Sequence, residues 1–386
     1  MCSVCMCSRF GATHTTKRAL TMGRIWNFSA GPAAMPEDVL RELGGDLLDL
    51  EGTGIGILEH SHRQPPFDRV LAGALDCCRR LGEIPATHEI LFVPGGATLQ
   101  FALIPLNLLP DGGVADYPDT DIWTAKAIVE ARDAVPTAKI VVPFEGKRCA
   151  YDHVPSDAEC PASTGAAYMH YCSNNTVHGT QYTKPPRCVD GAVLINDASS
   201  EIFSRPVDWS AHGMVYASGQ KNLGVAGMSV IIVRRDLLQR APRKLPSMFS
   251  YAAHAKAGSR INTPPTFAIH ALWRMCQWML REGGVAEMER RTHARARLVQ
   301  DAIDASGGFY TPLGHASCRS VINASFRLPT AQLDECFWKD AARDGIDGLA
   351  GHREAGGIRA SMYNSCPLPA VKALVDFMRE FRRTKG

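Results

Sequence analysis

The fold of this chain is decided by the stretch Ala192-Val193-Leu194-Ile195-Asn196-Asp197, an apolar run that ends in a carboxylate. Consecutive apolar residues without polar alternation are typical of a strand in a sheet that helices cover on both faces. A second run, Met214-Val215-Tyr216-Ala217, has the same character and is soon followed by Lys221. The sequence therefore predicts two buried strands with an acid and an amine near their ends.

Further apolar runs predict more strands of the same sheet, at residues 89–93, 139–142, 167–171 and 229–233. Apolar residues at helical spacing predict helices from about residue 36 to 48 and from about residue 66 to 81. A glycine turn at Gly95-Gly96 joins one strand to another helix, which is the pattern of an α/β unit. We predict an α/β fold whose large domain has a mixed, mostly parallel sheet between helices.

The order of elements changes near residue 289. Pro264-Pro265 opens a long helix, and a second helix, rich in Arg and Glu, follows it. Beyond that helix the order is strand, helix, strand, helix, which predicts a small α+β C-terminal domain. The predicted parts are a disordered extension, a segment packing on the small domain, the large domain and the small domain, at residues 1–22, 23–38, 39–289 and 290–386.

Composition excludes several classes of protein. With 386 residues, of which 45% are hydrophobic, the chain forms a large core and is no short binding module. The formal net charge is +3, but four basic residues and no acid lie in the first 24 residues, so the remainder is close to neutral. Such a balance argues against nucleic acid as a partner, and no apolar stretch is long enough to span a membrane.

The thirteen cysteines lie mostly singly in a chain too long to require disulfides, and we interpret them as reduced thiols of an intracellular protein. Cys2, Cys5 and Cys7, and the pair His60 and His62, lack further ligands nearby in sequence, so we predict no metal. Residues 1–22 contain Ser, Thr and Arg but no acid, which fits an organellar transit peptide as well as a plain extension. We predict a cytoplasmic protein, with an organelle as the alternative.

Asp197 and Lys221 have the chemistry to hold opposite ends of one cofactor. A lysine amine forms a Schiff base with an aldehyde, and a carboxylate keeps a pyridine nitrogen protonated, which is the arrangement that pyridoxal 5'-phosphate (PLP) requires. Two other interpretations stay open, since Lys221 also fits a surface turn and Asp197 also fits a helix N-cap.

The turn Gly95-Gly96-Ala97-Thr98 lies where a strand ends and a helix begins. Small residues at such a position let a phosphate approach the free N–H groups at the positive end of the helix. A glycine turn is equally common as a simple break between two elements.

Separate segments of the chain resemble the phosphoserine aminotransferase family of the class V, fold-type I PLP-dependent enzymes. The resemblance extends over nearly all of residues 26–386. It rests on Asn27-Phe28-Ser29-Ala30-Gly31-Pro32, Ser61-His62-Arg63, Tyr168-Met169-His170-Tyr171-Cys172, Gly219-Gln220-Lys221-Asn222, Asn262-Thr263-Pro264-Pro265-Thr266-Phe267 and Gly351-His352-Arg353 with Gly356-Gly357 and Arg359.

The resemblance implies a role for each residue around the cofactor ring. Lys221 would bind PLP covalently and shuttle the proton, and Asp197 would pair with the pyridine nitrogen. Trp123 would stack on the ring and Thr176 would bind its hydroxyl group. Without the resemblance, Trp123 fits an ordinary buried aromatic residue and Thr176 fits a loop cap.

The resemblance also implies which residues hold the cofactor phosphate. They are Ala97, Thr98 and Gln220 of one subunit with Asn262 and Thr263 of a second. It thereby implies a homodimer with shared active sites. By themselves, Asn262 and Thr263 before two prolines also fit a plain helix entry.

Substrate selection is assigned to arginines, because a planar guanidinium matches both a carboxylate and a phosphate. By resemblance Arg359 binds the α-carboxylate. His352 and Arg353, with Arg63 from the other subunit, would bind the distal phosphate or the side-chain carboxylate of glutamate. A single arginine in a charged chain more often forms a solvated ion pair.

The implied reaction is amino transfer between L-glutamate and 3-phosphohydroxypyruvate, giving O-phospho-L-serine and 2-oxoglutarate in serine biosynthesis. 4-Phosphohydroxy-L-threonine of vitamin B6 synthesis is a further candidate substrate. The alternatives are another class V reaction, such as that of serine–glyoxylate aminotransferase or cysteine desulfurase, and a noncatalytic PLP-binding scaffold.

Overall fold

A seven-stranded sheet forms the centre of the computed structural model, which describes residues 23–386. Residues 1–22, the predicted extension with Cys2, Cys5 and Cys7, lie outside the described part. The strand order is β2 (His88–Pro94), β10 (Met228–Arg234), β9 (Met214–Ser218), β8 (Val193–Asp197), β5 (Ala166–Cys172), β3 (Val114–Asp116) and β4 (Lys139–Val141). Only β10 runs antiparallel to its neighbours, so the predicted mixed, mostly parallel sheet is confirmed.

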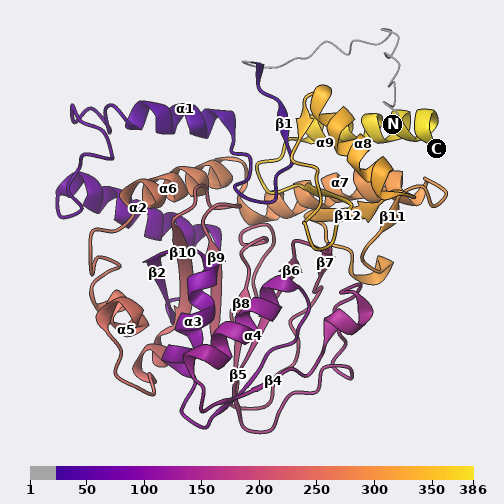
Figure 1. Ribbon diagram of the computed structural model, residues 1–386. Helices are drawn as coiled ribbons and strands as arrows, with labels where there is room; N and C mark the ends of the chain where they lie inside the picture. Colours follow the sequence, from indigo (N-terminus) through magenta and orange to yellow (C-terminus); the bar gives the residue numbers. More distant parts are fainter. Residues whose placement is uncertain (1–22) are drawn as a thin grey trace, which may run out of the picture.

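Helices cover both faces of this sheet (Figure 1). One face packs on α1 (Glu37–Asp46), α2 (Pro65–Leu81) and α6 (Thr266–Arg281). The other packs on α3 (Ala97–Leu108), α4 (Ile122–Ala134) and α5 (Tyr251–Lys256). Val215 of β9 enters the first core and its neighbour Tyr216 enters the second. Each residue of the inner strands therefore has to be apolar or internally hydrogen-bonded, which explains the unbroken apolar runs.

A second core lies in the C-terminal part of the chain. The strands β11 (Thr311–Pro312), β12 (Asn323–Arg327) and β14 (Ile358–Ser361) form a small antiparallel sheet there, packed on α8 (Ala331–Arg343) and α9 (Leu368–Lys385). In Figure 1 this part lies beside β1 (Trp26–Asn27), which pairs in parallel with β13 (Ile346–Asp347). The first strand of the described residues thus pairs with a strand of the C-terminal part.

One continuous helix, α7 (Gly284–Asp304), joins the two cores. Met288 near its beginning packs in the core of the large sheet, whereas Val299 and Ile303 pack in the C-terminal core. The domain boundary expected at residues 289–290 falls inside this helix.

The remaining elements are short. They are the β6–β7 pair (Asn174–Asn175 and Thr180–Gln181) and the 3-10 helices Gly146–Cys149, Arg235–Gln239, Ser247–Phe249 and Ala316–Cys318. Sequence patterns missed β3, whose three residues are too few to show a pattern, and His60 and His62 lie in turns instead of on the strand that their spacing indicated. None of the helices within residues 23–386 is both long and apolar enough to cross a bilayer.

Phe28 offers a test of how the N-terminal segment is anchored. Its side chain is 0% exposed in the C-terminal core, and its carbonyl accepts a hydrogen bond from Ser361 N at 3.1 Å. We expect Phe28→Ala to lower the free energy of unfolding by about 3 to 5 kcal/mol, because it removes a large buried ring. Urea denaturation measures this loss. The matched Ile25→Ala variant, at a residue that is 47% exposed, should change little, and equal effects of the two substitutions would contradict the anchoring role.

Candidate active site

Asp197 and Lys221 lie at the same edge of the large sheet. Asp197 is the last residue of β8, and it pairs with Cys172 of β5 on one side and with Tyr216 of β9 on the other. Lys221 follows the end of β9 by three residues. The carboxyl ends of parallel strands meet at one edge, where α/β proteins bind their ligands. The two residues predicted from the sequence are therefore brought together.

Asp197 is a buried acid, with 4% of its surface exposed. Its Oδ1 accepts a hydrogen bond from Ser199 N at 2.9 Å, and the Tyr216 hydroxyl also hydrogen-bonds to its side chain. Burial raises the pKa of Asp197, although these hydrogen bonds and the charge of Lys221 oppose the rise. The ionised carboxylate would gain most from a cation placed against it.

A row of aromatic residues, joined by hydrogen bonds and ring stacking, supports the Asp197 side chain. His170 Nε2 lies 2.9 Å from the Tyr216 hydroxyl, and burial lowers the pKa of His170 to about 3, so its ring is neutral. Because the Tyr216 hydroxyl donates to Asp197, it accepts from the N–H of His170. The Tyr117 ring stacks on His170 with centroids 4.9 Å apart. Sequence reasoning missed this row, since histidine and tyrosine within an apolar run look like ordinary strand residues.

Lys221 is held between two segments that are distant in sequence. Its Nζ donates a hydrogen bond to Thr176 Oγ1 at 3.2 Å, and Thr176 is buried. From the other side, Ala33 N donates to the carbonyl of Gln220 at 2.9 Å. Gly31 lies against the lysine stem, since a Cβ placed on it would be in van der Waals contact with Lys221 Cγ at 3.4 Å, and its φ of +142° favours glycine at this position. The lysine is thus oriented by contacts that the sequence alone did not reveal.

The predicted phosphate turn adjoins Gln220. Gly96 is the N-cap of α3 and makes no side-chain cap hydrogen bond, so the first N–H groups of the helix, at Ala97 and Thr98, remain available. Ser218 Oγ would lie 3.2 Å from a Cβ on Gly96, and this hydroxyl donates to Gln220 Oε1. The structure therefore places a helix N-terminus and the Gln220 amide around one space, as an anion requires.

Trp123 lies in the first turn of α4, and Asp121 caps that helix. Asp121 also accepts hydrogen bonds from His178 Nδ1 at 3.2 Å and from Val177 N at 3.4 Å. Trp123 is thereby fixed beside the turn that carries Thr176. Its indole Nε1 is buried and has no hydrogen-bond partner within residues 23–386.

The predicted substrate residues lie on β14 and on the loop at residues 351–357. A Cβ on Gly351 would lie 1.9 Å from the carbonyl oxygen of Gly356, so the loop excludes any side chain there. Ala355 of this loop packs with Ile122 and Val177, next to Trp123.

Within residues 23–386 no ion pair compensates the charges of these residues. Burial lowers the pKa of Arg359, and its Nε has no partner in the described part of the chain. Burial, followed by the charge of Arg359, lowers the pKa of His352. Arg353 is exposed. A half-buried guanidinium whose Nε lacks a partner, beside an exposed one, suits the recognition of an anionic ligand.

Three other predicted residues lie apart from this site. Arg63, Asn262 and Thr263 are exposed, and within residues 23–386 no hydrogen bond or ion pair links them to Asp197 or Lys221. Arg260, two residues before Asn262, donates to the His62 carbonyl at 3.5 Å. The three residues thus gather on a second region of the surface.

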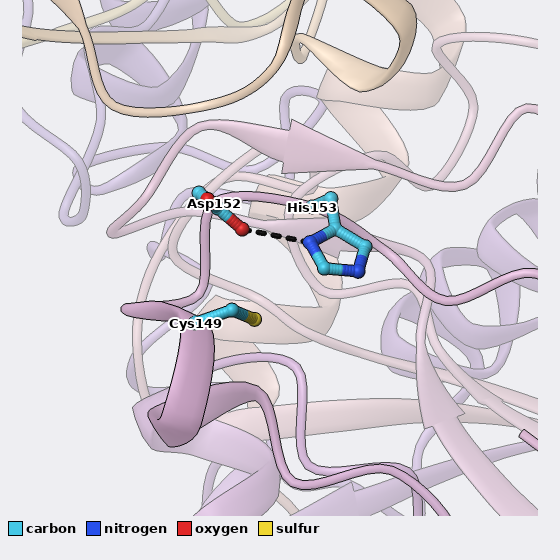
Figure 2. A group of neighbouring side chains, drawn as sticks. All are labelled: Cys149, Asp152 and His153. Atoms are coloured by element: carbon cyan, nitrogen blue, oxygen red, sulfur yellow. Dashed lines mark hydrogen bonds and ion pairs between the residues drawn. The ribbon is translucent and has the colours of Figure 1, made fainter. Parts of the chain in front are cut away.

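A separate group of side chains has the chemistry of metal ligands. Figure 2 shows Cys149, Asp152 and His153, whose ligand atoms all lie within 4.8 Å of one another. Asp152 Oδ1 already pairs with His153 Nδ1 at 2.7 Å, and its Oδ2 pairs with His315 Nε2 at 3.1 Å. These contacts satisfy the carboxylate without an ion.

The site fits PLP, on three observations. An amine and a buried acid lie at one sheet edge, at Lys221 and Asp197. An uncapped helix N-terminus lies beside Gln220, for a phosphate. Trp123 Nε1 and Arg359 Nε are buried polar atoms that still lack partners within the described residues. Lys221, Asp197, Thr176 and the α3 N-terminus are therefore the residues that would hold the cofactor.

Comparisons with known proteins agree with this chemistry. The family model described as aminotransferase class-V matches residues 25–374. The phosphoserine aminotransferases of Desulfosudis oleivorans and Geobacillus kaustophilus are each 43% identical, over 94% of this chain and 99% of their own length.

Solved structures are similar over the same range. The phosphoserine aminotransferase from Bacillus circulans subsp. alkalophilus superposes with a TM-score of 0.90 at 39% identity, covering 94% of this chain and 99% of its own. The PLP-bound phosphoserine aminotransferase from Trichomonas vaginalis gives 0.86 at 34% identity, covering 92% and 100%.

The raised pKa of Asp197 predicts how pH affects the cofactor-free protein. The pKa of this carboxyl in the folded state lies above the ordinary value of 3.8, so the free energy of unfolding falls as the pH rises from about 3.8 to the raised pKa and stays lower above it. Asp197→Asn removes that loss. We expect the cofactor-free variant to melt at a higher temperature than wild type at about pH 7, with a difference that shrinks toward about pH 4. Melting curves of both proteins, with the exposed Asp133→Asn as control, measure the effect. A variant that melts lower at neutral pH would refute it.

Proposed function

Because the chain belongs to the class-V aminotransferase family, and within it to the phosphoserine aminotransferases, we propose that it transfers the amino group of L-glutamate to 3-phosphohydroxypyruvate. The products are O-phospho-L-serine and 2-oxoglutarate, in serine biosynthesis. The enzyme is a PLP-dependent transaminase. One observation carries the choice of substrate, namely the half-buried, partly unpaired Arg359 beside the loop of His352 and Arg353.

Bound PLP supplies an electron-accepting ring and a carrier for the amino group. Lys221 Nζ would hold the cofactor, and once it is released from the cofactor this amine would take and return the α-proton of the substrate. The Thr176 hydroxyl, 3.2 Å from this nitrogen, orients it. Asp197, held by Ser199 and Tyr216, keeps its negative charge toward the ring nitrogen. His170 is buried and stays neutral, and its hydrogen bond to the Tyr216 hydroxyl fixes the direction of that hydroxyl.

The substrate carries a carboxylate at one end and a phosphate at the other. Arg359 binds the carboxylate, because a half-buried guanidinium without an ion pair in the described part of the chain gains from a paired contact. His352 and Arg353 bind the distal phosphate. Glutamate presents two carboxylates to the same groups, so a single site serves both substrates in turn.

The sites are shared between two subunits of a homodimer. Arg63, Asn262 and Thr263 are exposed and gather through Arg260 and His62. Residues that serve a neighbouring subunit's site have this arrangement, since a two-fold axis brings one surface region of each protomer to its partner. In the dimer, Arg63 reaches the distal phosphate, and Asn262 and Thr263 reach the cofactor phosphate.

A cytoplasmic location follows from the same function. Within residues 23–386 the ten cysteines are free, and Cys78 Sγ and Cys276 Sγ share a hydrogen bond at 3.8 Å without forming a disulfide, which supports a reducing compartment.

A substrate scan tests the proposed reaction. The purified holoenzyme is supplied with glutamate and 3-phosphohydroxypyruvate, or with 4-phosphohydroxy-L-threonine, serine plus glyoxylate, or cysteine. We expect kcat/KM for 3-phosphohydroxypyruvate to exceed that for glyoxylate by a factor on the order of 100, because only the former fills both anion-binding positions. Turnover of glyoxylate or cysteine without turnover of the phosphorylated acid would eliminate the proposal.

Arg353 tests the phosphate assignment. Arg353→Ala should lower kcat/KM for 3-phosphohydroxypyruvate about 10- to 100-fold, through the loss of one charge-assisted contact. PLP affinity, measured by absorbance titration, should stay nearly unchanged. The control is Arg187→Ala, since the Arg187 side chain is 87% exposed and pairs only with Asp157. Equal losses of substrate and cofactor binding in Arg353→Ala would argue against the assigned role.

Mixed dimers test whether the sites are shared. Neither Lys221→Ala nor Arg63→Ala homodimers should turn over the phosphorylated acid efficiently. After subunit exchange in an equal mixture, about half of the dimers are mixed, and one of the two sites in each mixed dimer has both residues intact. The activity of the mixture should therefore recover to about a quarter of wild type. No recovery, in a mixture shown by mass spectrometry to contain mixed dimers, would mean that each subunit uses its own Arg63.

A further inference from the structure

A cavity of about 400 Å³ lies away from Lys221 and Asp197. Its walls come from three elements, namely Trp278 of α6, residues Arg291, Ala294 and Arg295 of α7, and the turn at residues 364–368 before α9. Pro36 closes one side. Its volume is within the range of pockets that hold small organic molecules.

Arg295 is the unusual residue of this cavity, because it is a buried charge without a counter-charge. Its surface is 2% exposed, and within residues 23–386 no carboxylate forms an ion pair with it. Its guanidinium donates to the Cys366 carbonyl at 2.9 Å, the Asn364 carbonyl at 3.3 Å and Thr292 Oγ1 at 2.8 Å. The third nitrogen of the guanidinium, Nε, has no partner in that part of the chain.

The neighbouring acids do not compensate this charge. Glu287 pairs with Arg290 and Arg291, and Glu282 pairs with Arg291 at 2.7 Å. Residues 1–22 contain no Asp or Glu, so the N-terminal part of the chain cannot supply a carboxylate either. A buried guanidinium without an anion is costly, and carbonyl oxygens offset only part of that cost.

The other walls are largely apolar. Trp278, Ala294, Pro367 and Leu368 surround the space beside Arg295. Together with one unpaired guanidinium, they match a ligand that has an acidic end and an apolar body. We propose that this cavity is a second binding site, which takes a small carboxylic acid with an apolar body and holds its carboxylate on Arg295.

The site shares one wall with the catalytic centre. Asn364 N donates to Asn222 Oδ1 at 2.9 Å, and Asn222 directly follows Lys221. Ser365 Oγ donates to the Ala34 carbonyl at 2.6 Å, in the segment that lies over Lys221. A ligand in the cavity therefore touches the turn that holds this segment in place.

Benzoate is a suitable probe, and benzamide is its uncharged counterpart. Binding of each to the holoenzyme is measured by isothermal titration calorimetry. We expect benzoate to bind at least about tenfold more tightly than benzamide, because only benzoate offers a charge-assisted contact to the guanidinium. Equal binding of the two probes, or no binding of benzoate, overturns the proposal.

Three variants locate the bound probe. Arg295→Met and Ala294→Phe should each weaken benzoate at least about tenfold, the first by removing the charge and the second by filling the space. Arg359→Met, in the substrate site, should keep the affinity. The opposite pattern, with loss in Arg359→Met and retention in the other two, overturns the proposal in favour of the substrate site. If Arg295→Met does not fold, Ala294→Phe decides alone, since it leaves the hydrogen bonds of Arg295 in place.

Discussion

The burial of one carboxylate, that of Asp197, is the constraint on which the rest of the structure depends. An ionised acid at the end of an inner strand is stable only if fixed dipoles and charges surround it. Ser199 N, the Tyr216 hydroxyl and Lys221 supply them from three different segments. Their positions follow from the pairing of β5, β8 and β9 in one register. The sheet is thus the frame that aligns charges around a cofactor ring.

The sequence predicts this frame well because its signal is local. Successive residues of β9 and β10 enter different cores, so each position is apolar and the run is visible without any knowledge of its neighbours. β3 escaped prediction because it has three residues and ends in Asp116, a polar residue whose Oδ2 accepts from Ser163 N at 2.8 Å. Its place in the sheet is set by the strands on both sides, and such contacts leave no local trace.

The residues of the active site also differ in whether a local sequence signal indicates them. Asp197 and Lys221 were predictable because each carries a reactive group next to an apolar run. Asp197 ends one such run and Lys221 follows another. His170 was not, since its hydrogen bond to Tyr216 joins β5 to β9 across the intervening β8. The support of Lys221 by Gly31 depends on the N-terminal segment returning to the sheet edge. Arg63 lies near Asn262 and Thr263 because Arg260 joins their two segments by its hydrogen bond to His62. No spacing in the sequence indicates this contact.

The closure of the site by both ends of the chain has a consequence for the synthesis of the enzyme. Tyr363 donates to the Ala30 carbonyl at 2.6 Å and Ser365 donates to that of Ala34, across 333 and 331 residues of sequence. The ribosome makes the N-terminal segment first, but its binding surface emerges last. The large sheet can form during translation, whereas the wall over Lys221 has to wait for the final helix. Prematurely terminated chains therefore carry both the lysine and the acid, yet they lack a closed active site.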